Sequence, residues 1–90
     1  MNDNFTYLIS YDMVGDGNYD TLINHIKSYG TWAHITESTW AIVSQKTATE
    51  IRDEVKKYLS NGSRLIVIKS ANVAAWSNAL CTNEWLKEHI

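Results

Sequence analysis

The alternation of apolar and polar positions along the chain predicts four β-strands. In the first, polar residues at Thr6 and Ser10 interrupt aromatic and β-branched residues with the two-residue period of a strand. The two middle strands are separated by little more than Glu37 and are expected to form a hairpin. The last has an unbroken apolar middle, which is typical of a central strand buried on both faces. These strands are predicted at residues 5–11, 31–36, 38–44 and 64–69.

Helical spacing of apolar residues predicts three helices, at residues 19–29, from 47 to 58 or 59, and at 83–90. The first is followed by Gly30, at the position where a glycine commonly ends a helix. The second begins with Thr47 and Glu50 at the spacing of a capping box, in which each side chain bonds to the other residue's backbone N–H. Thr82 can cap the third.

This order of elements predicts a single α/β (α+β) domain over residues 1–90, namely a ferredoxin-like βαββαβ sandwich with a short C-terminal helix. In that arrangement two helices cover one face of the sheet. We expect the helix-free face to carry Ser38 and Trp40 and to be available to a partner. The facing depends on strand register, because a one-residue error would send Trp40 into the core and expose Thr39 instead.

Size and composition restrict the kinds of partner that the chain is expected to bind. A chain of 90 residues buries only roughly 60–65% of the surface that its unfolded form exposes, so we expect a homodimer or a larger homo-oligomer built on the helix-free face. The net charge of −2 and the scattering of eight lysines and arginines disfavour duplex nucleic acid as a partner. A single cysteine, Cys81, favours a reducing compartment, and no segment approaches the ~20 apolar residues of a membrane span, so a cytoplasmic location is expected.

Several segments between residues 5 and 69 together resemble the small CRISPR-associated adaptation protein family. They are Tyr11-Asp12, Gly30, Ser38-Thr39-Trp40 and the strand that starts at Arg64. The resemblance implies a ferredoxin-like fold and a homodimer. Because that family includes metal-dependent nucleases, it also implies that Asp12 from each protomer would hold Mg²⁺ at the dimer axis, where oxygen ligands suit this ion.

The chain is still more similar to a group of compact relatives of that family. The shared segments are Tyr11-Asp12, Gly30-Thr31-Trp32, Ser38-Thr39-Trp40 and Trp85-Leu86-Lys87. The similarity implies a relation to phage anti-CBASS proteins, which evade immunity by sequestering cyclic nucleotide signals. This resemblance implies a small nucleotide as ligand, although no motif in the chain identifies that ligand.

Two candidate sites lie around the end of the first strand. Asp12 is the catalytic residue if the chain is a nuclease; alternatively it accepts hydrogen bonds from the loop that follows. That loop, residues 14–18, is either a simple turn or a phosphate cradle made by glycine N–H groups, and the charges of Asp16 and Asp20 oppose the cradle. No histidines, cysteines or carboxylates have zinc spacing, so no metal site or cofactor is predicted.

A nucleotide site is predicted in a groove between two protomers. The paired tryptophan-bearing strands offer a flat apolar surface on which a base can stack. Histidine, serine and lysine side chains near those strands can donate to phosphate. The predicted lining residues are Tyr11, Trp32, His34, Ser38 and Trp40, with Lys69 nearby. The alternatives are that the tryptophans only pack in the core and at an interface, and that His34 is a hydrogen-bonded sheet residue.

Three functions remain open on the sequence. The first is a non-catalytic binder of small nucleotides, for which a sponge of cyclic dinucleotide signals is one candidate. The second is a Mg²⁺-dependent endonuclease of the CRISPR-adaptation type. The third is a structural subunit whose partner is another protein. The acidic isoelectric point of about 5.8 and the lack of a second acidic cluster favour the first over the second, so we expect a protein that is not an enzyme.

Overall fold

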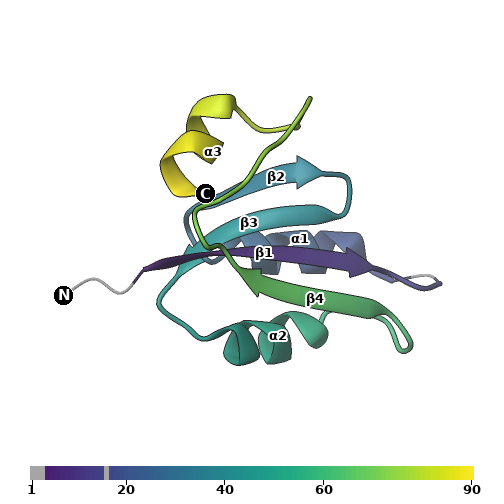
Figure 1. Ribbon diagram of the computed structural model, residues 1–90. Helices are drawn as coiled ribbons and strands as arrows, with labels where there is room; N and C mark the ends of the chain where they lie inside the picture. Colours follow the sequence, from purple (N-terminus) through teal and green to yellow (C-terminus); the bar gives the residue numbers. More distant parts are fainter. Residues whose placement is uncertain (1–3, 16) are drawn as a thin grey trace.

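The computed structural model describes residues 4–15 and 17–90, and within them four strands form one antiparallel sheet beside three helices (Figure 1). The sheet order is β2-β3-β1-β4. The mixed α/β class and the predicted elements are therefore confirmed. Their bounds are β1 (Phe5–Asp12), α1 (Tyr19–Lys27), β2 (Trp32–Thr36), β3 (Thr39–Ser44), α2 (Ala48–Lys56), β4 (Arg64–Lys69) and α3 (Asn83–His89).

The helices begin where local sequence signals place them. Thr47 and Glu50 form the predicted capping box: the backbone N–H of Thr47 donates to Glu50 Oε1 at 3.0 Å, and that of Glu50 donates to Thr47 Oγ1 at 3.2 Å. Thr82 accepts from the backbone N–H of Trp85 and caps α3. Gly30 follows α1 with a φ of +98°, a left-handed conformation that glycine adopts without a steric penalty. None of the helices in the described part of the chain has the length and hydropathy needed to cross a bilayer.

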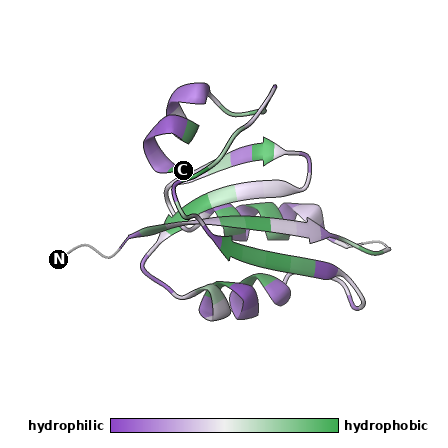
Figure 2. Cartoon of the chain, in the orientation of Figure 1, coloured by the Kyte–Doolittle hydropathy of each residue, from purple (hydrophilic) through white to green (hydrophobic). Residues whose placement is uncertain are grey.

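One face of the sheet and two helices enclose the core. Both α1 and α2 pack on this face and contribute their apolar stripes to it. Figure 2 shows α2 with hydrophilic residues on its outer side, as expected for a helix that buries a single stripe. The core residues are Tyr7, Ile9, Tyr11, Leu22, Ile26, Trp40, Ile42, Ile51 and Val55.

The predicted facing of Trp40 is wrong. In the β1–β3 ladder Trp40 lies opposite Ile9, and its side chain is only 2% exposed on the face that α1 and α2 cover. The residues of β3 are largely apolar on both faces of the sheet. Trp40 and Ile42 point to one face, and Ala41 and Val43 point to the other. Local pattern does not separate these two pairs, and the fold places the bulkier one against the helices, where more space must be filled.

The opposite face is only partly free. Figure 1 shows α3 on the other side of the sheet from α1, and Thr6 Oγ1 on that face donates to the His89 carbonyl at 2.6 Å. Leu86 of α3 is buried, as are the small residues Ala33 and Ala41. The helix-free face predicted from the sequence is therefore reduced to the part formed by β1 and β4.

The prediction that the fourth strand is central and buried on both faces is also wrong. β4 is an edge strand that pairs with β1 alone. Its residues Leu65 and Val67 pack against the core, whereas Ile66 and Ile68 on the other face are 54% and 48% exposed. Because an apolar run gives no information about which neighbours cover it, such a run does not distinguish a central strand from an edge strand with an uncovered face.

Candidate functional site

The six residues predicted to line a nucleotide groove do not form one surface. Tyr11 and Trp40 are buried side by side in the core, where Trp40 Nε1 donates to the Tyr11 hydroxyl at 3.2 Å. Burial raises the pKa of Tyr11, and the hydrogen bond from Trp40 opposes that rise. In this conformation neither side chain reaches a ligand. Instead, Trp40 packs against the aromatic residues of β2, and Tyr11 is bonded to Trp40.

Trp32 and His34 of β2 pack on Trp40 from the sheet edge. The His34 ring stacks on the Trp40 indole with centroids 4.1 Å apart and planes 11° apart. The Trp32 ring lies 5.5 Å from the Trp40 ring and is tilted by 52°. His34 Nε2 donates to the Glu37 carbonyl at 3.1 Å, which ties the ring to the β2–β3 turn. Trp32, His34 and Trp40 thus form an aromatic cluster on the face of the sheet that α1 and α2 cover.

Ser38 and Lys69 do not join this cluster as ligand donors. Ser38 lies in the β2–β3 turn, where its carbonyl accepts from the backbone N–H of Tyr11 at 3.1 Å. Lys69 ends β4, three strand spacings or about 14 Å across the sheet from β2. Its Nζ lies 3.6 Å from the centroid of the Phe5 ring. The predicted position of Lys69 beside the tryptophans is therefore wrong.

An aromatic pocket of about 420 Å³ opens beside β2 instead. Residues of β2 line it together with residues of α3 and of the segment that leads into α3. That segment is held to the edge of β2 by the Leu80 backbone N–H, which donates to the Ile35 carbonyl at 2.9 Å. The lining residues are Trp32, Ala33, His34, Leu80, Cys81, Thr82 and Trp85.

Trp85 and Lys27 are the members of this region that sequence reasoning missed. Trp85 comes from α3 and stacks on His89, with ring centroids 4.2 Å apart. Lys27, at the end of α1, places its Nζ 4.8 Å from the centroid of the Trp32 ring. Neither placement has a local signal, because Trp85 requires α3 to lie beside β2 and Lys27 requires the end of α1 to lie beside Trp32. The pocket is thus lined by Trp85 of α3 and by Trp32 and His34 of β2, whose rings lie against Trp40 on the side that α1 covers, with Lys27 beside Trp32 on that side.

Asp12 is engaged in a cross-strand ion pair rather than with the loop that follows it. Its Oδ2 accepts from Arg64 Nη1 at 2.9 Å, and both side chains are exposed. In the loop, the Val14 N–H donates to Ser63 Oγ at 3.0 Å, so one N–H of the proposed phosphate cradle is already bonded. Asp16 lies outside the described residues. Within the described residues, no three histidines, cysteines or carboxylates gather as a metal site would require.

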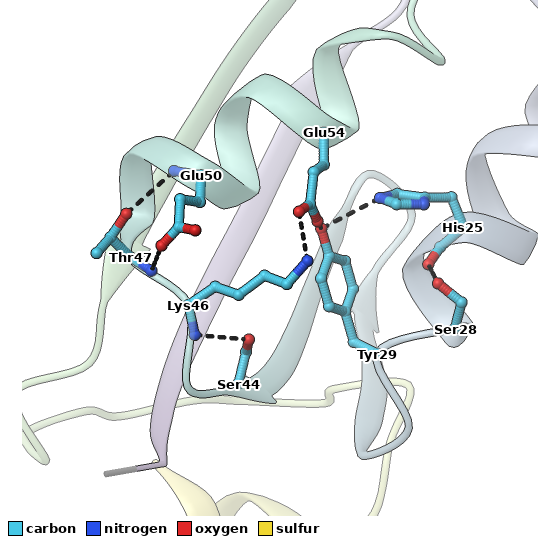
Figure 3. A network of polar contacts seen from close by, with 8 residues as sticks. All are labelled: His25, Ser28, Tyr29, Ser44, Lys46, Thr47, Glu50 and Glu54. Carbon is cyan, nitrogen blue, oxygen red and sulfur yellow. Dashed lines mark hydrogen bonds and ion pairs between the residues drawn. The ribbon is translucent and has the colours of Figure 1, made fainter.

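A cluster of polar side chains, which was not predicted from the sequence, joins the two core helices (Figure 3). Tyr29 follows α1, and its hydroxyl donates to Glu54 Oε1 of α2 at 2.6 Å. The hydroxyl also lies 3.1 Å from His25 Nε2, and Lys46 forms an ion pair with the other oxygen of Glu54. His25 stacks on Tyr58, with ring centroids 4.5 Å apart.

The contacts of this cluster shift the pKa values of Tyr29, Glu54 and His25. Burial, followed by the hydrogen bond to Glu54, raises the pKa of Tyr29 far above its ordinary value. Hydrogen bonds from Lys46 and Tyr29 lower the pKa of Glu54. Burial lowers the pKa of His25. A phenol that stays protonated and donates to a carboxylate is a stable structural link, so we assign the cluster to the α1–α2 contact and not to chemistry.

Comparisons with protein-family models, with curated proteins and with solved structures found no significant match to this chain. The resemblance to the CRISPR-associated adaptation family and to its compact relatives therefore stays a prediction.

Proposed function

We propose that this chain is a non-catalytic nucleotide-binding protein whose aromatic pocket beside β2 receives a base. One observation carries the proposal: Trp32, His34 and Trp85 line an open pocket of about 420 Å³. Stacking of a base on an aromatic side chain contributes roughly 1–3 kcal/mol, and it is available to any base because every base has a π-face. Trp40, stacked under His34, gives that side of the pocket a rigid support.

The charge beside the pocket suits a phosphorylated ligand. Lys27 carries an exposed ammonium group next to Trp32, and the long lysine side chain can turn from the indole toward a phosphate. Thr82 adds a hydroxyl to the pocket wall. A cyclic dinucleotide is the ligand we propose, and sequestration without chemistry is the activity. This revises the site predicted from the sequence: Trp32 and His34 are retained, Trp85 and Lys27 are added, and Tyr11, Trp40, Ser38 and Lys69 are left out.

We also propose that the domain belongs to the ferredoxin-like class. The order of elements from β1 to β4 is strand, helix, strand, strand, helix, strand. β3 lies between β1 and β2, and β1 lies between β3 and β4, with every neighbouring pair antiparallel. This interleaving of two strand–helix–strand units supports the split-βαβ assignment.

A second copy of the chain is the partner we propose for the uncovered part of the sheet. Ile66 and Ile68 stand there beside Leu8, and no described segment covers them. A domain of this size gains stability from burying such a surface. An isologous contact would present the same apolar residues from both protomers, and it would also suit a ligand with two-fold symmetry.

Calorimetric titration with cyclic dinucleotides tests the function. We expect saturable binding to the wild-type chain and about 5- to 150-fold weaker binding to Trp85→Ala, which removes one stacking surface. Lys27→Ala is an exposed change that should weaken binding without unfolding the domain. Tyr19→Ala, an exposed aromatic outside the pocket, is the matched control and should bind like wild type. The proposal fails if wild-type protein binds no cyclic nucleotide, or if folded Trp85→Ala and Lys27→Ala bind as tightly as wild type.

Sedimentation velocity tests the homodimer. Wild-type protein should sediment as a dimer at tens of micromolar, and Ile66→Asp should sediment as a folded monomer. Val73→Asp places the same charge at a more exposed apolar residue outside the sheet and should remain a dimer. A wild-type monomer at that concentration, or an Ile66→Asp dimer, would contradict the interface.

A further inference from the structure

The β4 strand leaves one row of main-chain groups open at the edge of the sheet. The Ser70 N–H donates to the Thr6 carbonyl, and bonding groups alternate along an antiparallel ladder. The N–H and C=O groups of Leu65 and Val67 therefore point away from β1. In the described part of the chain, no hydrogen bond outside the ladder involves the main chain of residues 65–69. The other edge of the sheet, β2, is already bonded by Leu80.

A groove between this edge and α2 provides room beside those groups. Two adjacent hollows of about 500 and 220 Å³ share the lining residues Arg52 and Leu65. Apolar residues from both sides contribute to the lining, among them Ala48, Leu59 and Val67. The residues that line them are Ala48, Thr49, Arg52, Lys56, Leu59, Ser60, Asn61, Gly62, Ser63, Leu65, Ile66 and Val67.

The charged side chains described along the groove have a single sign. Among the described residues, Arg52 and Lys56 are the only charged ones that line it. Arg52 pairs with its neighbour Asp53, but both side chains are more than half exposed, and an exposed pair of this kind exchanges partners at little cost. Lys56 forms no ion pair with any described residue. A ligand that fills the groove is therefore favoured if it brings negative charge.

We propose that β4 and α2 form a docking groove for an extended acidic segment of another protein, which adds a fifth strand beside β4. Its main chain bonds to the open groups of Leu65 and Val67, and its acidic side chains face Arg52 and Lys56. β4 has six residues, so the groove accepts a segment of about the same length. The apolar residues in the lining favour a peptide over a bare phosphate, because alternate side chains of a strand can contact them.

Electrostatics disfavour a second copy of this chain as the occupant. An isologous pairing of two β4 edges would bring Arg52 and Lys56 of one protomer toward the same residues of its partner. It would also place Arg64 opposite Lys69 when the strands align end to end. Like charges placed opposite each other destabilise a strand pair. This groove shares Ile66 with the proposed homodimer face and no residue with the nucleotide pocket, so it is a third, adjoining surface of the domain.

The test uses the whole chain and two synthetic octapeptides with blocked ends, one alternating valine and glutamate, the other valine and lysine. Because the residues alternate, either set can face α2, and the register need not be known in advance. We expect the glutamate peptide to bind at least about tenfold more tightly than the lysine peptide. On binding, hydrogen exchange should slow at the amides of Leu65 and Val67. Methylation of every backbone nitrogen of the peptide should abolish binding, because it removes the strand pairing.

Paired variants separate the charges of the groove from the overall charge. The double variant Arg52→Glu and Lys56→Glu should bind the glutamate peptide about tenfold more weakly, because two exposed ion pairs become repulsive. Lys57→Glu with Lys87→Glu makes the same change in net charge outside the groove and should bind like wild type. The proposal is overturned if wild-type protein binds neither peptide, if the methylated peptide binds equally, if protection appears away from β4, or if β4 proves to be occupied by a second copy.

Discussion

Replacing Trp40 with alanine tests the placement on which the whole site depends. The indole is 2% exposed, stacks on His34 and donates to the Tyr11 hydroxyl. Truncation of a fully buried tryptophan typically costs about 3–5 kcal/mol, because the transfer energy is lost and a cavity remains. About 1 kcal/mol of that loss comes from the hydrogen bond and from leaving the Tyr11 hydroxyl without its partner. A domain of this size has a free energy of unfolding of roughly 5–13 kcal/mol, so the variant should remain folded but weak.

The companion variant is Trp32→Ala, which removes the same side chain from a position that is 37% exposed. We expect it to cost only about 1–2 kcal/mol, because a large part of this indole already contacts water. Urea denaturation followed by far-UV circular dichroism measures both losses, at one protein concentration because a dimer makes the midpoint concentration-dependent. The Trp40→Ala melting temperature should fall by roughly 12 °C or more.

The opposite ranking would refute the placement. If Trp40→Ala loses less than about 1 kcal/mol while Trp32→Ala loses more, then Trp40 is not in the core and β3 faces the other way. Equal losses would also contradict the large difference in exposure. Either result would undermine the aromatic pocket, because its support from Trp40 would be missing.

Four further outcomes are expected. The free energy of unfolding should fall as the pH drops below about 6.5. Burial holds the pKa of His25 below that ordinary value, so the unfolded chain takes up the proton first. The His25→Gln variant should lack this step. The free energy of unfolding should fall again below about 4.5, as the lowered pKa of Glu54 is crossed and its bonds to Lys46 and Tyr29 are lost. Thr47→Ala should cost about 1 kcal/mol in the same urea assay, since it removes the cap of α2, whereas Thr49→Ala in the first turn should cost little. Leu86→Asp should detach α3, which limited proteolysis would detect as cleavage confined to residues 70–90, and uniform resistance would contradict that docking.

Local features of the chain could be predicted from the sequence because their causes are local. The Thr47 and Glu50 capping box and the Thr82 cap need only residues three apart. The strand character of residues 64–69 follows from β-branched and apolar side chains. The number and order of the elements therefore followed from the sequence, and with them the mixed α/β class.

The placement of those elements required the tertiary structure. The same period of two describes both faces of a strand, so the sequence does not decide which face carries Trp40. The pairing of Ile9 with Trp40 fixes the register. The apolar run of β4 does not show that only β1 lies beside it. Of the groove residues predicted together, only Trp32 and His34 line the aromatic pocket.

The contacts that complete each site are long-range in the chain. Trp85 reaches the pocket because α3 docks against residues some fifty positions earlier, and Tyr29 reaches Glu54 because α1 and α2 share one face of the sheet. The sequence determined which residues favour helices, strands and caps, since those preferences act over a few residues. Only the tertiary structure decided which side chains meet, because packing couples residues whose separation in the chain carries no local signal.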